Sequence, residues 1–190
     1  MTIQELFVTS NRELLRVVDQ IKERQWDEML PEGISSKPAT LKEAIQYHTF
    51  DDAWVPDVLA GKTAGEVGDS YEFLLSSDDI LANYRKYNHV ASETVSSFDD
   101  LSRVTHLSYG DFPARDYLQH IVSFRAFRSY DFAKMLGLDT TMDPAFVDAL
   151  IAEFAPVIDG YRKMGVFPPA LSVVEGASQQ EKLLAMAGRA

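Results

Sequence analysis

The sequence contains no cysteine among its 190 residues. Without a thiol the chain has no disulfide, no thiolate nucleophile and no thiolate metal ligand, so zinc fingers and cysteine hydrolases are excluded. It also lacks an apolar run of the roughly 20 residues that span a bilayer. Residues 1–14 have neither the basic nor the apolar region of a signal peptide. We therefore expect a cytoplasmic protein.

Positive charge is scarce. The chain carries 18 lysines and arginines against 29 aspartates and glutamates, a formal charge of -11. An acidic surface repels nucleic acid and anionic membranes, so neither is expected as a partner. With 46% hydrophobic and 25% charged residues, the composition is that of an ordinary globular protein. We find no repeat, low-complexity tract or linker, and we predict one domain over residues 1–190.

Helix signals dominate the chain and predict an all-α fold. Apolar residues recur every three to four positions, and proline and glycine mark the breaks. We expect two loops, at 30–38 and 62–75, and an extended excursion or a small hairpin at 104–111. Pro56 is expected to kink or split the second helix, and Pro156 to interrupt the fifth. The expected helices are about 3–25, 40–61, 77–98, 111–137, 143–165 and 182–187, with capping boxes at Thr2/Glu5, Thr40/Glu43 and Ser178/Glu181 and Asp-plus-proline starts at Asp111/Pro113 and Asp143/Pro144.

His48 and Asp52 share one face of the second predicted helix, one turn apart. They could act as two ligands, or as a base and the group that orients it. The alternative is a buried histidine bonded to a neighbour, with Asp51 and Asp52 as solvated helix charge. The residues alone leave both interpretations open.

A polar stripe follows the fourth predicted helix. Its members recur every three to four residues and adjoin the core face: Asp116, His120, Phe124, Arg128 and Asp131. Such a stripe is either the solvent face of the helix or the half-buried lining of a site inside a bundle. An arginine against the core must be paired. Asp131 on the same helix and Asp52 across the bundle are the candidate partners.

Several segments together resemble a known family. They are HTFDDAWVPDVLAGKTAGEVGD from His48, THLSYGDFPARDYL from Thr105, SYDFAKMLGLD from Ser129, and the closing GYRKMGVF and LLAMAGR. In this order and spacing they resemble DinB-like proteins related to mycothiol-dependent maleylpyruvate isomerase, over roughly residues 40–190. The resemblance implies a DinB/YfiT-like four-helix bundle with additional short helices, often paired as a homodimer.

The resemblance also implies a divalent metal held by three residues in the centre of the bundle. These positions fall on His48, Phe124 and Arg128, and the aspartate that follows them in the family is retained as Asp131. Phenylalanine cannot bind a cation, and arginine repels one. Only His48 is thus retained, and we expect no cofactor. A relocated zinc or nickel site of His48, Asp52 and His120 is the alternative.

Three functions remain open. The favoured one is a family member with a degenerate metal site that binds a small, perhaps anionic, ligand or a partner, since an arginine suits a carboxylate. The second is a metal-dependent thiol transferase or mycothiol-dependent isomerase-type enzyme with a rearranged metal site. The third is a structural or dimerising bundle without a ligand. Substrate identity, the use of mycothiol and oligomeric state do not follow from the sequence.

We predict that calorimetric titration with zinc or nickel shows no sub-micromolar site that depends on His48, because two of the three family positions carry Phe124 and Arg128. A tight site that disappears in His48→Ala would contradict this prediction. It would favour the relocated metal site instead.

Overall fold

The computed structural model describes residues 1–35 and 37–190. Ser36, in the loop expected at 30–38, lies outside the described residues. The described chain divides into two compact units, residues 2–139 and residues 140–190 with Met1. The expectation of one domain stays a prediction.

Helices make up most of the larger unit. The elements in chain order are α1 (Ile3–Val18), the 3-10 turn η1 (Glu23–Gln25), α2 (Leu41–Leu59), α3 (Ala64–Val67), the 3-10 turn η2 (Glu72–Leu75), α4 (Ile80–Ser97), β1 (Val104–Leu107), β2 (Gly110–Pro113) and α5 (Ala114–Leu136). The all-α prediction is confirmed, with one two-stranded sheet among the described residues. No described helix combines the length and the apolar character that crossing a bilayer requires.

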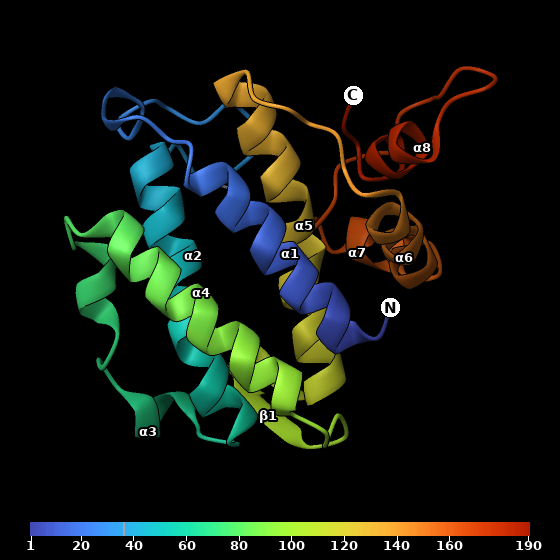
Figure 1. Ribbon diagram of the computed structural model, residues 1–190. Helices are drawn as coiled ribbons and strands as arrows, with labels where there is room; N and C mark the ends of the chain where they lie inside the picture. Colours follow the sequence, from blue (N-terminus) through green and yellow to red (C-terminus); the bar gives the residue numbers. More distant parts are fainter. Residues whose placement is uncertain (36) are drawn as a thin grey trace. The chain divides into compact units, whose positions relative to one another are not determined.

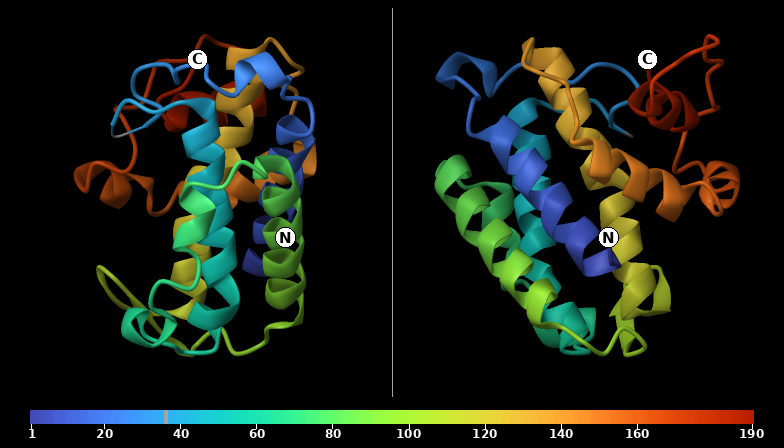
Figure 2. Two further views of the ribbon diagram at one scale, coloured as in Figure 1. Left: turned by 90° about the vertical axis from the view of Figure 1, so that its left-hand side faces the viewer. Right: turned by 45° about the vertical axis from the view of Figure 1, so that its right-hand side comes forward.

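Four long helices pack against one another in this unit. α1 lies against α5 and α4, and α2 lies against α4, as the views agree (Figures 1 and 2). The antiparallel hairpin β1–β2 pairs Val104 with Pro113 and Leu107 with Gly110, and it contacts α2 and α5. The small hairpin, one of two forms expected at 104–111, is therefore the form observed. It lies beside one end of these two helices.

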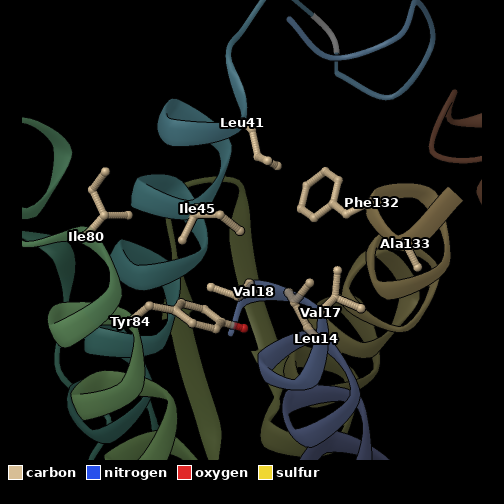
Figure 3. Close-up of a cluster of buried hydrophobic side chains, with 9 residues drawn as sticks. All are labelled: Leu14, Val17, Val18, Leu41, Ile45, Ile80, Tyr84, Phe132 and Ala133. Atoms are coloured by element: carbon tan, nitrogen blue, oxygen red, sulfur yellow. The ribbon is translucent and has the colours of Figure 1, made fainter. Parts of the chain in front are cut away.

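At the end of the four long helices that lies away from the hairpin, the core is apolar. Leu14, Val17 and Val18 of α1 converge on Leu41 and Ile45 of α2 (Figure 3). α4 and α5 complete this cluster with Ile80, Tyr84, Phe132 and Ala133. Fully burying a side chain of this size contributes about 1.5–3 kcal/mol, so the cluster holds the four helices together.

The smaller unit contains α6 (Pro144–Phe154), α7 (Ile158–Lys163) and α8 (Gln179–Met186). Asp143 caps α6 as expected, and Pro156 falls in the break between α6 and α7. α6 packs on α8. The rings of Phe154, Tyr161 and Phe167 meet with centroids 6.2–6.4 Å apart, which gives this unit an aromatic core.

Helix starts follow the local capping chemistry. The expected capping boxes at Thr2, Thr40 and Ser178 are all formed. A fourth, Thr63 with Glu66, begins the short helix α3 inside the segment expected to be a loop. α1 ends at Val18 rather than near residue 25, and η1 follows it.

Two proline positions refine the predictions. α2 continues through Pro56 to Leu59, so of the two forms expected there the split helix is not the one observed. Pro113, not Asp111, is the cap of α5. Asp111 lies in β2 instead, where its Oδ1 is 2.8 Å from Nδ1 of His106.

We predict that Thr40→Ala lowers the free energy of unfolding by about 1 kcal/mol, because the Thr40 hydroxyl accepts a hydrogen bond from the Glu43 N–H at 3.2 Å at the start of α2. Urea denaturation measures the change. Thr94→Ala is the control, since that hydroxyl only donates back to Val90 within α4. Equal effects of the two substitutions would contradict the role of the cap.

Candidate functional site

The centre of the larger unit is a layer of polar side chains. Each of the four long helices buries a stripe of residues at helical spacing, and the second or third member of each stripe is polar. We call Asn11, Asp52, Asn88 and Arg125 the polar layer. The stripes are Phe7, Asn11, Leu14 and Val18 on α1; His48, Asp52, Val55 and Leu59 on α2; Tyr84, Asn88, Ala91 and Val95 on α4; and Leu118, Val122, Arg125 and Ser129 on α5.

An ion pair joins two members of the polar layer. Arg125 Nη1 donates to Asp52 Oδ1 and, at 2.6 Å, to Asn11 Oδ1. The side chains of Arg125 and Asp52 are both 0% exposed. Asn88 Nδ2 donates to the Asn11 carbonyl and to the Tyr84 hydroxyl, each at 3.3 Å. The layer therefore connects α1, α2, α4 and α5 through hydrogen bonds.

The ion pair is not fully satisfied. Among the described atoms, Nε and Nη2 of Arg125 and Oδ2 of Asp52 have no hydrogen-bond partner. Burial raises the pKa of Asp52, while the charge and hydrogen bond of Arg125 oppose this rise. The ring of Phe7 lies 5.6 Å from the guanidinium carbon of Arg125 and supplies a favourable cation–π contact.

His48 lies one turn before Asp52 on α2 and is 6% exposed. Its ring stacks on Phe124 with centroids 5.7 Å apart and meets the edge of Phe132 at 6.1 Å. Burial, reinforced by the charges of Arg125 and Arg128, lowers the pKa of His48 well below its ordinary value. The imidazole is therefore neutral at physiological pH. No described atom pairs with its buried Nδ1.

A pocket of about 610 Å³ opens beside His48, between α2, α5 and the segment that precedes α2. We call it the His48 pocket. Its apolar wall includes Leu30, Ile34 and Phe124, and its charged groups are Lys37, Glu43, Asp51 and Arg128. A pocket of this volume holds a small organic molecule. His48, Phe124 and Arg128 all line it, so the three positions singled out in the sequence converge on one cavity.

Arg128 is paired on its own helix. Its Nη1 donates to Asp131 Oδ2 at 3.1 Å, and 21% of its side chain is exposed against 8% for Asp131. The expected pairing with Asp131 is confirmed, whereas the alternative pairing with Asp52 is wrong. Asp52 instead pairs with Arg125, which lies deeper in the core.

The remaining members of the stripe lie toward the hairpin. His120 Nδ1 is 3.2 Å from the Tyr109 hydroxyl, and the His120 and Phe112 rings meet edge to face with centroids 5.0 Å apart. Burial lowers the pKa of His120. Asp116, one turn earlier, is half-buried. The stripe thus runs along the border of the core, as the sequence indicates.

The structure does not bring His48, Asp52 and His120 together as a metal site. Within the part of the chain that is described, no group of three or more histidine, aspartate or glutamate side chains could hold an ion. Asp52 bonds to Arg125, and His120 contacts the hairpin. This geometry gives no support to the relocated site.

Arg125 is the residue that the sequence analysis missed. It lies next to Phe124 and outside the polar stripe, and an arginine on an apolar face carries no motif. A signal was nevertheless present, because every long helix carries a polar residue in the interior of a buried stripe at i, i+4, i+7 spacing. Four such polar positions, one on each of four helices that pack together, indicate a shared buried layer.

Comparison of the chain with family models, curated proteins and solved structures finds no match.

We predict that Arg125→Met lowers the free energy of unfolding by about 3–5 kcal/mol, because it leaves the Asp52 carboxylate buried without a counter-charge. Combining Arg125→Met with Asp52→Leu should recover much of this loss, since both charges are then removed. Urea denaturation of the parent, single and double variants measures both effects. A single variant as stable as the parent would show that the pair is not buried.

We predict that Asp51→Asn stabilises the protein at pH 8 but not near pH 4. Burial, reinforced by Asp52 and opposed by Arg125, raises the pKa of the half-buried Asp51 to about 7. The folded state then holds a proton that the unfolded state releases near pH 4, so the free energy of unfolding falls as pH rises from about 4 to 7. The advantage of Asp51→Asn should reach about 1–3 kcal/mol by pH 8.

Asp57→Asn, on the same helix, is the matched control for this pH dependence. A hydrogen bond from Lys62 lowers the pKa of Asp57, so this carboxylate stabilises the fold above about pH 4. Its substitution should therefore show the opposite trend with pH. Parallel pH profiles for the parent and Asp51→Asn would contradict the shift at Asp51.

Proposed function

We propose that this protein binds a small molecule carrying a carboxylate in the His48 pocket, and that it is a DinB-like four-helix bundle whose family metal site is degenerate. The observation that carries the proposal is the convergence of His48, Phe124 and Arg128 on one cavity of about 610 Å³. The four long helices of the larger unit are compatible with the family fold. The proposal concerns binding and assigns no reaction.

The pocket offers two basic groups to an anion, against two acidic ones. Arg128 and Lys37 carry fixed positive charge, while His48 is neutral because its pKa is lowered by burial. Of the two acidic groups, Glu43 accepts hydrogen bonds from Thr40 at the cap of α2. An arginine at the edge of an apolar cavity suits a carboxylate.

The apolar wall favours an organic body behind that carboxylate. Phe124 stacks on His48 and faces the pocket with Leu30 and Ile34. A flat ring or a branched chain would remove these surfaces from water, at about 25 cal/mol for each Å² buried. Benzoate therefore represents the simplest probe of the proposed ligand class.

The experiment is thermal unfolding of the parent protein and of Arg128→Met in a series of benzoate concentrations. At ten times its dissociation constant, benzoate should stabilise the parent by about 1.4 kcal/mol, and Arg128→Met should abolish this effect. Lys42→Met is the matched control, because Lys42 lies on α2, pairs with Asp78 and does not line the pocket. It should respond to benzoate as the parent does.

Two outcomes would overturn the proposal. One is the absence of any stabilisation of the parent by benzoate. The other is equal stabilisation of the parent and Arg128→Met, which would place the anion elsewhere. The stability of Arg128→Met without ligand is recorded in the same experiment. It should fall less than that of Arg125→Met, because the Arg128–Asp131 pair is partly exposed.

A further inference from the structure

A second pocket adjoins the His48 pocket and differs from it in chemistry. It has a volume of about 430 Å³ and lies between α2, α5 and the β1–β2 hairpin. Asp51 and Phe124 line both cavities. We call it the aromatic pocket, because rings from all three of these parts of the chain line it: Phe50, Trp54, Tyr109, Tyr117 and Phe124.

The aromatic pocket has one carboxylate and no fixed positive charge. Among the described residues that line it, none is a lysine or an arginine, and Asp51 is the one acidic residue. Burial keeps His120 neutral by lowering its pKa and keeps Tyr117 neutral by raising its pKa. The second histidine of the lining, His106, lies 2.8 Å from Asp111. The charge that Asp51 brings to the lining is therefore not balanced by a basic side chain there.

Asp51 itself has unused bonding capacity. No described residue donates a hydrogen bond to its carboxylate. The guanidinium of Arg125 acts on it through its charge, but Arg125 gives its hydrogen bonds to Asp52 and Asn11. A half-buried carboxylate without a donor is costly when ionised. A cation bound beside it would reduce that cost.

We propose that the aromatic pocket binds an organic ammonium ion, with the positive charge beside Asp51 and against the surrounding rings. The faces of tryptophan, tyrosine and phenylalanine attract cations, and each such contact contributes about 0.5–2 kcal/mol. The proposal does not rest on the proposed function, because it invokes a different cavity and the opposite ligand charge.

The probe is (4-hydroxyphenyl)trimethylammonium, and its matched control is 4-tert-butylphenol, which has the same shape without the charge. Both are titrated at pH 8, where Asp51 is ionised because its pKa is about 7. The cation should bind about tenfold or more tightly than the neutral compound. The indole N–H signal of Trp54 in the proton–nitrogen NMR spectrum should shift, whereas that of Trp26, which packs on the apolar cluster, should not.

Two variants locate the cation. Asp51→Asn should weaken binding of the cation about tenfold and leave binding of 4-tert-butylphenol nearly unchanged. Asp57→Asn removes the same charge from the same helix but lies outside the pocket, so it should change neither affinity. Tyr109 is 63% exposed and so tolerates truncation. Tyr109→Ala should weaken binding of the cation several-fold.

Equal affinity for the cation and the neutral compound would overturn the proposal, and so would binding of neither. An equal loss in Asp57→Asn and Asp51→Asn would also overturn it, because the effect would then come from overall charge. The benzoate experiment is independent of these results. A protein that fails to bind benzoate can still bind the cation, and a protein that fails to bind the cation can still bind benzoate. Failure of one proposal is therefore distinguishable from failure of the other.

Discussion

The buried ion pair between Arg125 and Asp52 fixes how the four long helices of the larger unit align. A charge buried without its partner costs about 3–5 kcal/mol, a large fraction of the stability of a domain. α2 and α5 must therefore bring these two residues to the same level. Asn11 and Asn88 extend the constraint to α1 and α4, because they bond within the same layer. A shift of one helical turn would separate the members of this layer.

The candidate sites follow from that alignment. His48 precedes Asp52 by one turn, and Phe124 immediately precedes Arg125, so the pair that aligns α2 with α5 also stacks the imidazole on the phenyl ring. Asp51, next to Asp52, is held at the junction of the two cavities. The lowered pKa of His48 has the same origin, since burial and the neighbouring guanidinium groups both oppose its protonation.

Much of the fold could be predicted from the sequence because helix starts are determined locally. Thr2, Thr40 and Ser178 each carry a partner three residues later, and the geometry of a cap needs nothing else. The turn η2 could not be predicted, since a piece of four residues shows no periodicity, whereas α3 does carry a capping box in the sequence, Thr63 with Glu66. The polar stripe at Arg128 was predictable from its spacing. The partner of Asp52 was not, because a pairing across two helices depends on their alignment in space.

The polar layer also restricts how the sequence can change over evolution. Its members depend on one another, so replacing any one of them alone leaves an unsatisfied group in the core. Arg125 and Asp52 can be exchanged for apolar residues only together, and such an exchange is often neutral or stabilising once complete. Every single-step route passes through a variant of reduced stability. The low stability of the single-substitution variants therefore retains the pair, independently of any ligand that the protein binds.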